Sequence, residues 1–307
     1  MPGFPLPSSL RSIWHLLRDT VEGFIDDDAL SRGASIAYYT LFSLAPVLLI
    51  AIAIAGLAFG RDAARGAIVD QLSGLMGGKS AEALQAMVES ASNPKTGITA
   101  SIIGIVAALI TITGAFGEVQ SALNAIWKTK SRRSTLSRLM RARLASLGLV
   151  ATSGFLLTAS LVVSAALAAL SDYLKAVFPA AELTLQIVSL VISGTLLTAM
   201  FAAIYKVLPD TPIAWRDVII GALFTAGLFE GGKYVIALYI GKSDIASSYG
   251  AAGALIILLL WIFYSAQIFL LGAEFTRAFA RRYGTHAGRE VDKSVPTRRG
   301  VSNPIPS

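Results

Sequence analysis

Long apolar runs are the feature that most constrains how this chain can fold. Six segments of about 20 residues or more are dominated by apolar side chains. A bilayer core about 30 Å thick is crossed by roughly 20 helical residues, and only helices or closed barrels pair every backbone group inside it. The sequence therefore predicts an all-α polytopic membrane protein with six transmembrane helices. We place them at 36–59, 97–118, 144–169, 184–205, 217–240 and 251–273.

Composition agrees with this class and excludes several others. The chain is 54% hydrophobic and 15% charged, with a mean hydropathy of +0.65. It has no cysteine, which rules out disulfides, thiolate metal sites and a cysteine nucleophile. The first residues, "MPGFPLPSSLRSIWHLL", lack the apolar core and cleavage site of a secretory signal, so we expect the first span to direct membrane insertion.

Basic residues predict the orientation. The N-terminal segment, residues 119–143, residues 206–216 and the C-terminal tail hold 19 of the 26 Lys and Arg residues. Because cytoplasmic loops retain positive charge, both termini are predicted to be cytoplasmic. The net charge of +7 then indicates attraction to anionic lipid headgroups rather than nucleic-acid binding.

Three regions are expected along the chain. Residues 1–30 form an N-terminal cytoplasmic or interfacial helix, 31–283 the six-helix transmembrane domain, and 284–307 a disordered cytoplasmic tail. Helical spacing of Ile13, Leu16, Leu17, Val21 and Phe24 fits a helix lying in the membrane interface. A helix packed on the bundle fits the same pattern.

Residues 61–97 are too polar to span a membrane and too regular for a plain loop. Two short amphipathic helices are predicted on the outer face, one ending near Gly77 and Gly78 and the next starting at Ser80. They would serve as a structural cap or as a gate over the bundle.

Few residues have the pattern of a catalytic or metal site. Asp26, Asp27 and Asp28 could attract a divalent metal, but consecutive residues point in different directions on a helix. We expect them to cap the following helix, to face solvent and to pair with Arg32. His15 and His286 have no companions that would make either one catalytic or a zinc ligand.

The stretch "FTAGLFEGGKYVIALYIG" places an acid and a base inside a predicted span. If the helix enters from the cytoplasm near Asp217, Glu230 lies about 20 Å along it, past the midplane, and Lys233 lies a turn farther. An unpaired charge there costs at least about 2.5–3.5 kcal/mol, so each needs a partner. Their i, i+3 spacing allows an ion pair, which would be either functional or purely structural.

Other polar or kinked positions could line a cavity around this pair. Pro46 interrupts the hydrogen bonding of the first span, near Tyr38 on the same face. Tyr264 and Gln267 follow a stripe of the last span and offer hydrogen bonds between helices. We expect Tyr38, Pro46, Tyr249, Tyr264 and Gln267 to line a polar cavity centred on Glu230 and Lys233. Helix packing is the alternative for each of them.

Many transporters contain two inverted halves, which leave an internal repeat in the sequence. "GAFGE" of the second span and "GAEF" of the sixth resemble each other, but an inverted repeat would match the second span with the fifth. No inverted repeat is therefore predicted. The chain also lacks the phosphate-binding pattern GxxxxGK[ST], so no ATPase is expected within it.

Several stretches together resemble one known family. They are "GASIAYYTLFSLAPVLL", "GEVQSALNAIW", "YKVLPDTPIAWRDVIIGAL" and "SSYGAAGALIILLLWIFYSAQIFLLGAEF". In this order, across residues 10–283, they are similar to the YihY/virulence factor BrkB family of bacterial inner-membrane proteins. The resemblance implies six helices with cytoplasmic termini and supplies no active-site residues. It also implies a role in transport or envelope integrity, while an old ribonuclease label of the family fits poorly with a chain that lacks His or Cys clusters.

The sequence thus favours a protein, without enzymatic activity or cofactor, that moves or handles a membrane-associated substrate such as a lipid or envelope precursor. A non-transporting scaffold for envelope integrity is the alternative. A membrane enzyme is least favoured, because no nucleophile and base emerge as a pair. The expected partners are the bilayer and its anionic headgroups.

Overall fold

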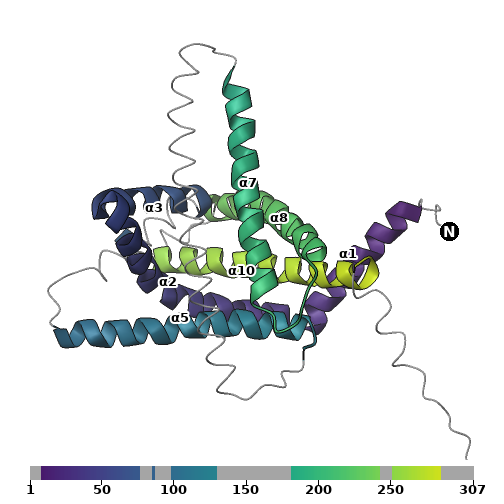
Figure 1. Cartoon of the computed structure of the whole chain (residues 1–307), viewed down its shortest axis with the longest axis horizontal. Helices are drawn as coiled ribbons and strands as arrows, with labels where there is room; N and C mark the ends of the chain where they lie inside the picture. Colours follow the sequence, from purple (N-terminus) through teal and green to yellow (C-terminus); the bar gives the residue numbers. More distant parts are fainter. Residues whose placement is uncertain (1–7, 77–84, 87–97, 130–180, 243–250, 285–307) are drawn as a thin grey trace, which may run out of the picture.

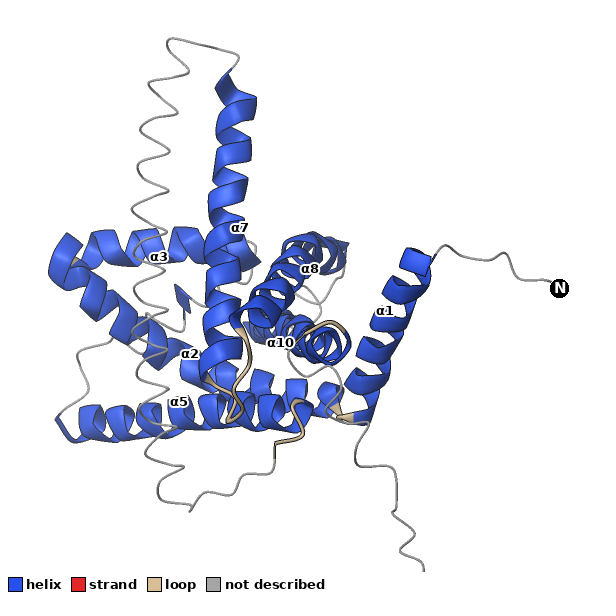
Figure 2. Ribbon diagram, turned by 45° about the vertical axis from the view of Figure 1, so that its right-hand side comes forward, coloured by secondary structure: helices blue, strands red, loops and turns tan. Residues whose placement is uncertain are grey.

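The computed structural model describes residues 8–76, 85–86, 98–129, 181–242 and 251–284. Within these ranges the regular structure is entirely helical, which confirms the all-α prediction (Figure 2). The helices are α1 (Ser8–Asp26), α2 (Ala29–Phe59), α3 (Arg61–Met76), α5 (Ile98–Ile126), α7 (Ala181–Val207), α8 (Trp215–Lys242) and α10 (Ala251–Arg282).

Five of the six predicted spans fall on these helices, and the third, 144–169, lies outside the described residues. In the described part of the chain, three helices have segments long and apolar enough to cross a membrane. These are Leu190–Val207 of α7, Trp215–Ile240 of α8 and Leu255–Arg282 of α10. The count of six spans stays a prediction.

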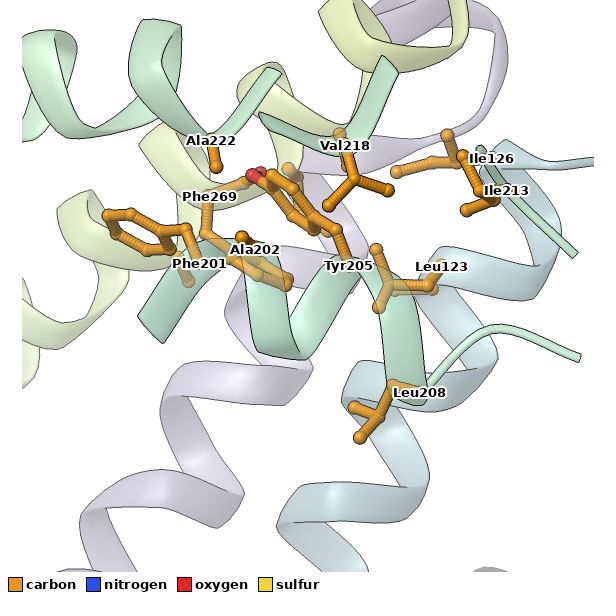
Figure 3. Packing of buried hydrophobic residues seen from close by; sticks show 14 of the residues in the cluster. Leu123, Ile126, Phe201, Ala202, Tyr205, Leu208, Ile213, Val218, Ala222 and Phe269 are labelled. Atoms are coloured by element: carbon orange, nitrogen blue, oxygen red, sulfur yellow. The ribbon is translucent and has the colours of Figure 1, made fainter. Parts of the chain in front are cut away.

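Helix α10 is the centre of the arrangement. It packs against α8, α2 and α1, and α7 packs against α8 (Figure 1). The largest core cluster forms where α5, α7, α8 and α10 meet, and burial of its apolar side chains holds these helices together. Figure 3 shows this cluster, with Tyr205 at its middle between Phe201, Phe269 and Leu123.

The connection between α7 and α8 is tied to the end of α5. Asn124 donates a hydrogen bond to the Asp210 carboxylate at 2.9 Å and accepts one from the Asp210 backbone N–H at 2.8 Å. Gln120 donates to the Leu208 carbonyl at 3.2 Å. These bonds fix where α7 ends and where α8 can begin.

Helix α1 combines the two alternatives predicted for the N-terminal region. Its residues Leu16 and Thr20 are buried, and Leu16 packs with Phe275 and Ala278 of α10. A second apolar face is exposed along α1. It consists of Ile13, Trp14, Leu17, Val21 and Ile25. The helix is therefore packed on the bundle and still presents an apolar stripe outward, whose contact with a membrane interface stays a prediction.

Helix α3 lies where the first of the two outer-face helices was predicted. It buries Ala64 and Ile68, and Ile68 joins a cluster with Leu48 of α2 and Leu258 of α10. Most of the second predicted helix lies outside the described residues. The placement of this region on the outer face stays a prediction.

Candidate functional site

Helix α8 carries the acid and base that the sequence singled out. It begins at Trp215 with Asp217 in its first turn, where a carboxylate complements the helix dipole. Glu230 and Lys233 form an ion pair one turn apart, as their spacing predicted. Their side chains are 21% and 22% exposed, so neither is fully buried.

A five-residue pattern fixes α8 against α10. The sequence reads "GALFT" at 221–225 in α8 and "GAEFT" at 272–276 in α10. Each glycine faces the threonine of the other helix: a Cβ on Gly221 would lie 1.8 Å from Thr276 Oγ1, and one on Gly272 would lie 1.9 Å from Thr225 Oγ1. Small residues at such crossings allow close backbone approach.

In both copies of this pattern the threonine hydroxyl is hydrogen-bonded within its own helix. Thr225 donates to the Gly221 carbonyl and Thr276 to the Gly272 carbonyl, each at 2.7 Å. The repeat runs in opposite directions on the two antiparallel helices, and its phenylalanines, Phe224 and Phe275, stack with ring centroids 3.8 Å apart. This match between the fifth and sixth spans is not predicted from the sequence, because an inverted repeat would pair the second span with the fifth.

Tyr205 joins α7 to the same crossing. Its hydroxyl donates to the Phe269 carbonyl at 2.7 Å and lies 3.0 Å from Thr225 Oγ1. The side chain is buried, and its ring packs beside Phe269 and Phe201 (Figure 3). One hydroxyl group therefore links α7, α8 and α10.

On the α7 side, Glu230 borders an apolar groove of about 680 Å³. The groove lies between α7 and α8 and contains one ionisable side chain, Glu230, among its described lining residues. The others are Leu190, Val191, Gly194, Thr195, Thr198, Ala199, Ala202, Ala203, Trp215, Ile219, Leu223, Ala226 and Gly227. Leu223 is 57% exposed here, so the groove is open rather than sealed by the described helices.

On the α10 side, Lys233 enters a much tighter space. The crevice is lined by Lys233, Tyr264, Ser265 and neighbouring apolar side chains, and it has no room for a water molecule. The Tyr264 hydroxyl would lie 2.7 Å from a Cβ on Gly232, so this glycine lets α10 approach α8 beside the ion pair. The pair therefore has an open side at Glu230 and a packed side at Lys233.

The other predicted lining residues lie in different places. Tyr264 is beside Lys233, but Tyr38 is 57% exposed on α2, where its ring contacts Phe42. Pro46 lies inside α2, which continues to Phe59. Neither described space at the ion pair is lined by Tyr38 or Pro46.

Gln267 and Tyr249 do not line these two spaces either. Gln267 donates to the Leu30 carbonyl at 3.3 Å and lies against Gly33, so its observed contact is with α2. Tyr249 lies outside the described residues. The structure thus brings Glu230, Lys233 and Tyr264 together, with α7 as a wall that the sequence did not suggest.

Asp27 differs from its predicted role as a solvated or capping residue. It is buried and forms ion pairs with Lys128 and with Arg277, the latter at 3.1 Å. Arg32 bonds the Asp27 backbone carbonyl rather than a carboxylate, at 2.8 Å. The residue at the start of α2, Asp28, is in the left-handed conformation with φ 57° and makes no capping bond with its side chain. Because Lys128 and Arg277 are distant from Asp27 in sequence, no local pattern indicates that Asp27 is buried.

His15, the histidine within the described ranges, belongs to no metal site. His15 lies on α1 beside the charged residues of that helix, and His286 lies outside the described residues. Across the described ranges, no group of three or more His, Cys, Asp or Glu side chains could hold a metal ion.

Comparison with known proteins places the chain among membrane proteins. The sequence profile of a family described as "Virulence factor BrkB" matches residues 20–295. Similar proteins include a UPF0761 membrane protein of Alcanivorax borkumensis, 29% identical, with 90% of this chain and 63% of the relative covered. One from Ralstonia nicotianae is 32% identical, with 80% and 55% covered. One from Pseudoalteromonas translucida is 31% identical, with 82% and 81% covered.

The chain spans 63% and 55% of the length of the first two of these relatives. Their names describe membrane proteins and state no substrate or catalytic activity. No solved structure matches the chain.

Proposed function

Because the chain belongs to the virulence factor BrkB family of membrane proteins, we propose that it moves or handles a lipid-like substrate along the α7–α8 groove. The observation that carries this proposal is the composition of the groove. The apolar groove, which the described helices leave open, ends at the Glu230 carboxylate, and Lys233 pairs with that carboxylate. This arrangement fits an amphiphile with an acyl chain and a polar headgroup.

The size and lining of the groove fit an acyl chain as the bound group. Binding sites for small molecules are mostly apolar and occupy about 300–1,000 Å³, and this groove has about 680 Å³. Leu223 and Ile219 are 57% and 45% exposed in it, and covering them with an acyl chain removes apolar surface from water wherever the groove is wet.

The ion pair favours the binding of a headgroup at the end of the groove. Charges within a membrane are costly and commonly mark substrate pathways. Glu230 lines the groove, whereas Lys233 lines the crevice beside Tyr264, so the carboxylate is the member of the pair that a molecule in the groove would meet. A headgroup that donates hydrogen bonds would bind there without displacing Lys233.

The proposal includes the membrane placement expected from the sequence. We place the chain in the bacterial inner membrane with six spans and both termini in the cytoplasm. The described helices and the names of the relatives support a membrane protein, and the distribution of Lys and Arg supports the orientation. Transport would be passive, coupled to an ion or dependent on a partner protein.

A groove-filling substitution tests the proposal directly. Purified protein is reconstituted into vesicles, and movement of fluorescent phospholipids between leaflets is measured by chemical quenching of the outer leaflet. Leu223→Trp fills the groove and should abolish or strongly slow movement. Leu238→Trp, at an exposed position of the same helix that does not line the groove, is the matched control.

Variants of the ion pair form a second part of the experiment, which distinguishes a transporter from a scaffold. Glu230→Gln and Lys233→Met should each slow lipid movement while the protein stays folded. If either single change destabilises the protein and the double change restores stability without affecting movement, the pair is structural and the protein acts as a scaffold. Equal rates for Leu223→Trp and Leu238→Trp would likewise reject the groove as the path.

A further inference from the structure

The apolar groove between α7 and α8 has a second end, away from Glu230. On α8 its lining begins at Trp215, the first residue of the helix, whose side chain is 57% exposed. At 1.5 Å per residue, the helix from Trp215 to Glu230 is about 22 Å long, so the two ends are far apart. In the predicted orientation the Trp215 end lies at the cytoplasmic interface of the membrane, where tryptophan is common.

A lysine lies over this end of the groove. The lining residues of α7 recur every three or four positions, as at Thr198 and Ala202, and Lys206 in the last turn continues the same face. Its ammonium group lies 5.4 Å from the centroid of the Trp215 ring and donates to the Ile213 carbonyl. Lys206 therefore reaches from α7 across to the start of α8, at the mouth of the groove.

The Lys206 ammonium group can bind a further acceptor. It has three N–H donors, and its hydrogen bond within the described residues uses one of them. The carboxylates nearest in sequence face other helices. Asp210 accepts a bond from Asn124 of α5, and Asp217 is buried against Gly284 at the end of α10. A negative group at the mouth of the groove would thus meet the lysine rather than these acids.

The Trp215 ring is unsuited to a headgroup that carries a positive charge. The face of an indole ring attracts a quaternary ammonium group such as that of choline. Here Lys206 already lies over the ring, and a second cation beside it would be repelled. The charge at this end therefore favours a headgroup with a net negative charge over one in which a choline group neutralises the phosphate.

We infer that the α7–α8 groove selects lipids whose headgroup has a net negative charge, with the headgroup phosphate bound by Lys206 at the Trp215 end. This inference rests on the proposed function, because the groove must first accept a lipid. Phosphatidylglycerol fits both ends of the groove. Its headgroup is negative, as Lys206 requires, and its hydroxyl groups can donate hydrogen bonds to Glu230.

A binding measurement tests the selection without requiring lipid movement. The purified full chain in a neutral detergent is titrated against short-chain fluorescent phosphatidylglycerol and phosphatidylcholine with the same acyl chains, and binding is followed by fluorescence anisotropy. Phosphatidylglycerol should bind about 5-fold more tightly, the scale of one lysine beside a charged headgroup. Equal affinities for the two lipids would overturn the inference.

Variants at the two neighbouring cations separate a specific site from general attraction. Lys206→Gln should remove most of the preference for phosphatidylglycerol, and Lys206→Arg should keep it. Arg216→Gln makes the same change of charge at an exposed position next to Trp215 that does not line the groove, and should leave the preference unchanged. An equal loss in Lys206→Gln and Arg216→Gln, or no loss in Lys206→Gln, would reject Lys206 as the selecting residue.

A groove-filling variant distinguishes failure of this inference from failure of the proposed function. Leu223→Trp should weaken binding of both lipids. If it does so while Lys206→Gln keeps the preference, the groove still binds lipid and only the inferred selection is wrong. If Leu223→Trp weakens neither lipid, the groove is not the binding site and both proposals fail. Should Lys206→Gln not fold, a preference of the unmodified protein that survives Arg216→Gln supports the inference, and its absence rejects it.

Discussion

Thr276 of α10 occupies the space that any side chain at Gly221 of α8 would need. A Cβ on Gly221 would lie 1.8 Å from Thr276 Oγ1 and 2.7 Å from its Cβ. Atoms of a branched side chain at such distances cannot be accommodated without separating the two helices. The crossing of α8 and α10 therefore depends on a hydrogen atom at this position.

Gly221→Ala is expected to destabilise the protein for this reason. Overpacking a tight contact costs about 1–3 kcal/mol. Thermal unfolding of the purified protein in detergent measures the effect. Gly231→Ala is the control on the same helix, because among the described residues no atom outside its own stretch of α8 lies within 4 Å of its Cβ position. That change should be neutral or stabilising, since alanine favours a helix over glycine. Equal unfolding temperatures for the two variants would contradict the described crossing.

Tyr205→Phe is expected to loosen the contact of α7 with α8 and α10. The change removes the hydroxyl that donates to the Phe269 carbonyl, and because this carbonyl keeps its bond within α10, the cost is about 0.5–1.5 kcal/mol. Thermal unfolding again measures the loss. Tyr239→Phe removes a hydroxyl from an exposed position of α8 and should change stability little. A similar loss of stability in both variants would show that the Tyr205 hydroxyl contributes no more than an exposed one.

Asp27→Ala is expected to release α1 from the bundle. It leaves Arg277, whose side chain is 13% exposed, without one of its two carboxylate partners, and removing one partner of a buried pair costs about 3–5 kcal/mol. Limited trypsin digestion at Arg18 should then become faster. Asp19→Ala breaks an exposed pair with Arg282, which contributes about 0–1 kcal/mol, and should have little effect. Unchanged digestion of Asp27→Ala would contradict the contact.

The absence of cysteine allows a direct test of the orientation, because any introduced thiol is unique. Asp62→Cys places a thiol on α3, predicted to be outside, and Pro212→Cys places one between α7 and α8, predicted to be inside. Both positions are exposed in the structure. A membrane-impermeant maleimide should label Asp62→Cys in intact cells and Pro212→Cys only after permeabilisation. The opposite pattern would invert the proposed topology.

Local patterns in the sequence predicted the features that depend on near neighbours. The apolar runs placed five of the predicted spans on described helices, three of which have segments long and apolar enough to cross a membrane, because length and hydropathy are properties of one segment. The Glu230–Lys233 pair was predicted from its spacing, because both residues are on the same helix. Neither prediction required knowledge of how the helices pack.

Features that join distant segments could not be predicted in the same way. Asp27 pairs with Lys128 and Arg277, which lie 101 and 250 residues away, so no local spacing indicates its burial. The groove beside Glu230 is formed partly by small residues of α7, such as Gly194 and Ala199, which have no chemical signature of a site. Gln267 is polar in a span, as a lining residue would be, yet its observed partner is the Leu30 carbonyl of α2.

The repeated pattern at the α8–α10 crossing has a consequence for membrane insertion. "GALFT" meets "GAEFT" through an approximate two-fold axis, so the contact looks nearly the same when the helix pair is turned end over end. Such a contact stabilises the pair equally in either direction and carries no information about which end belongs in the cytoplasm. That choice must come from groups outside the crossing, of which the basic residues flanking the spans are the evident source.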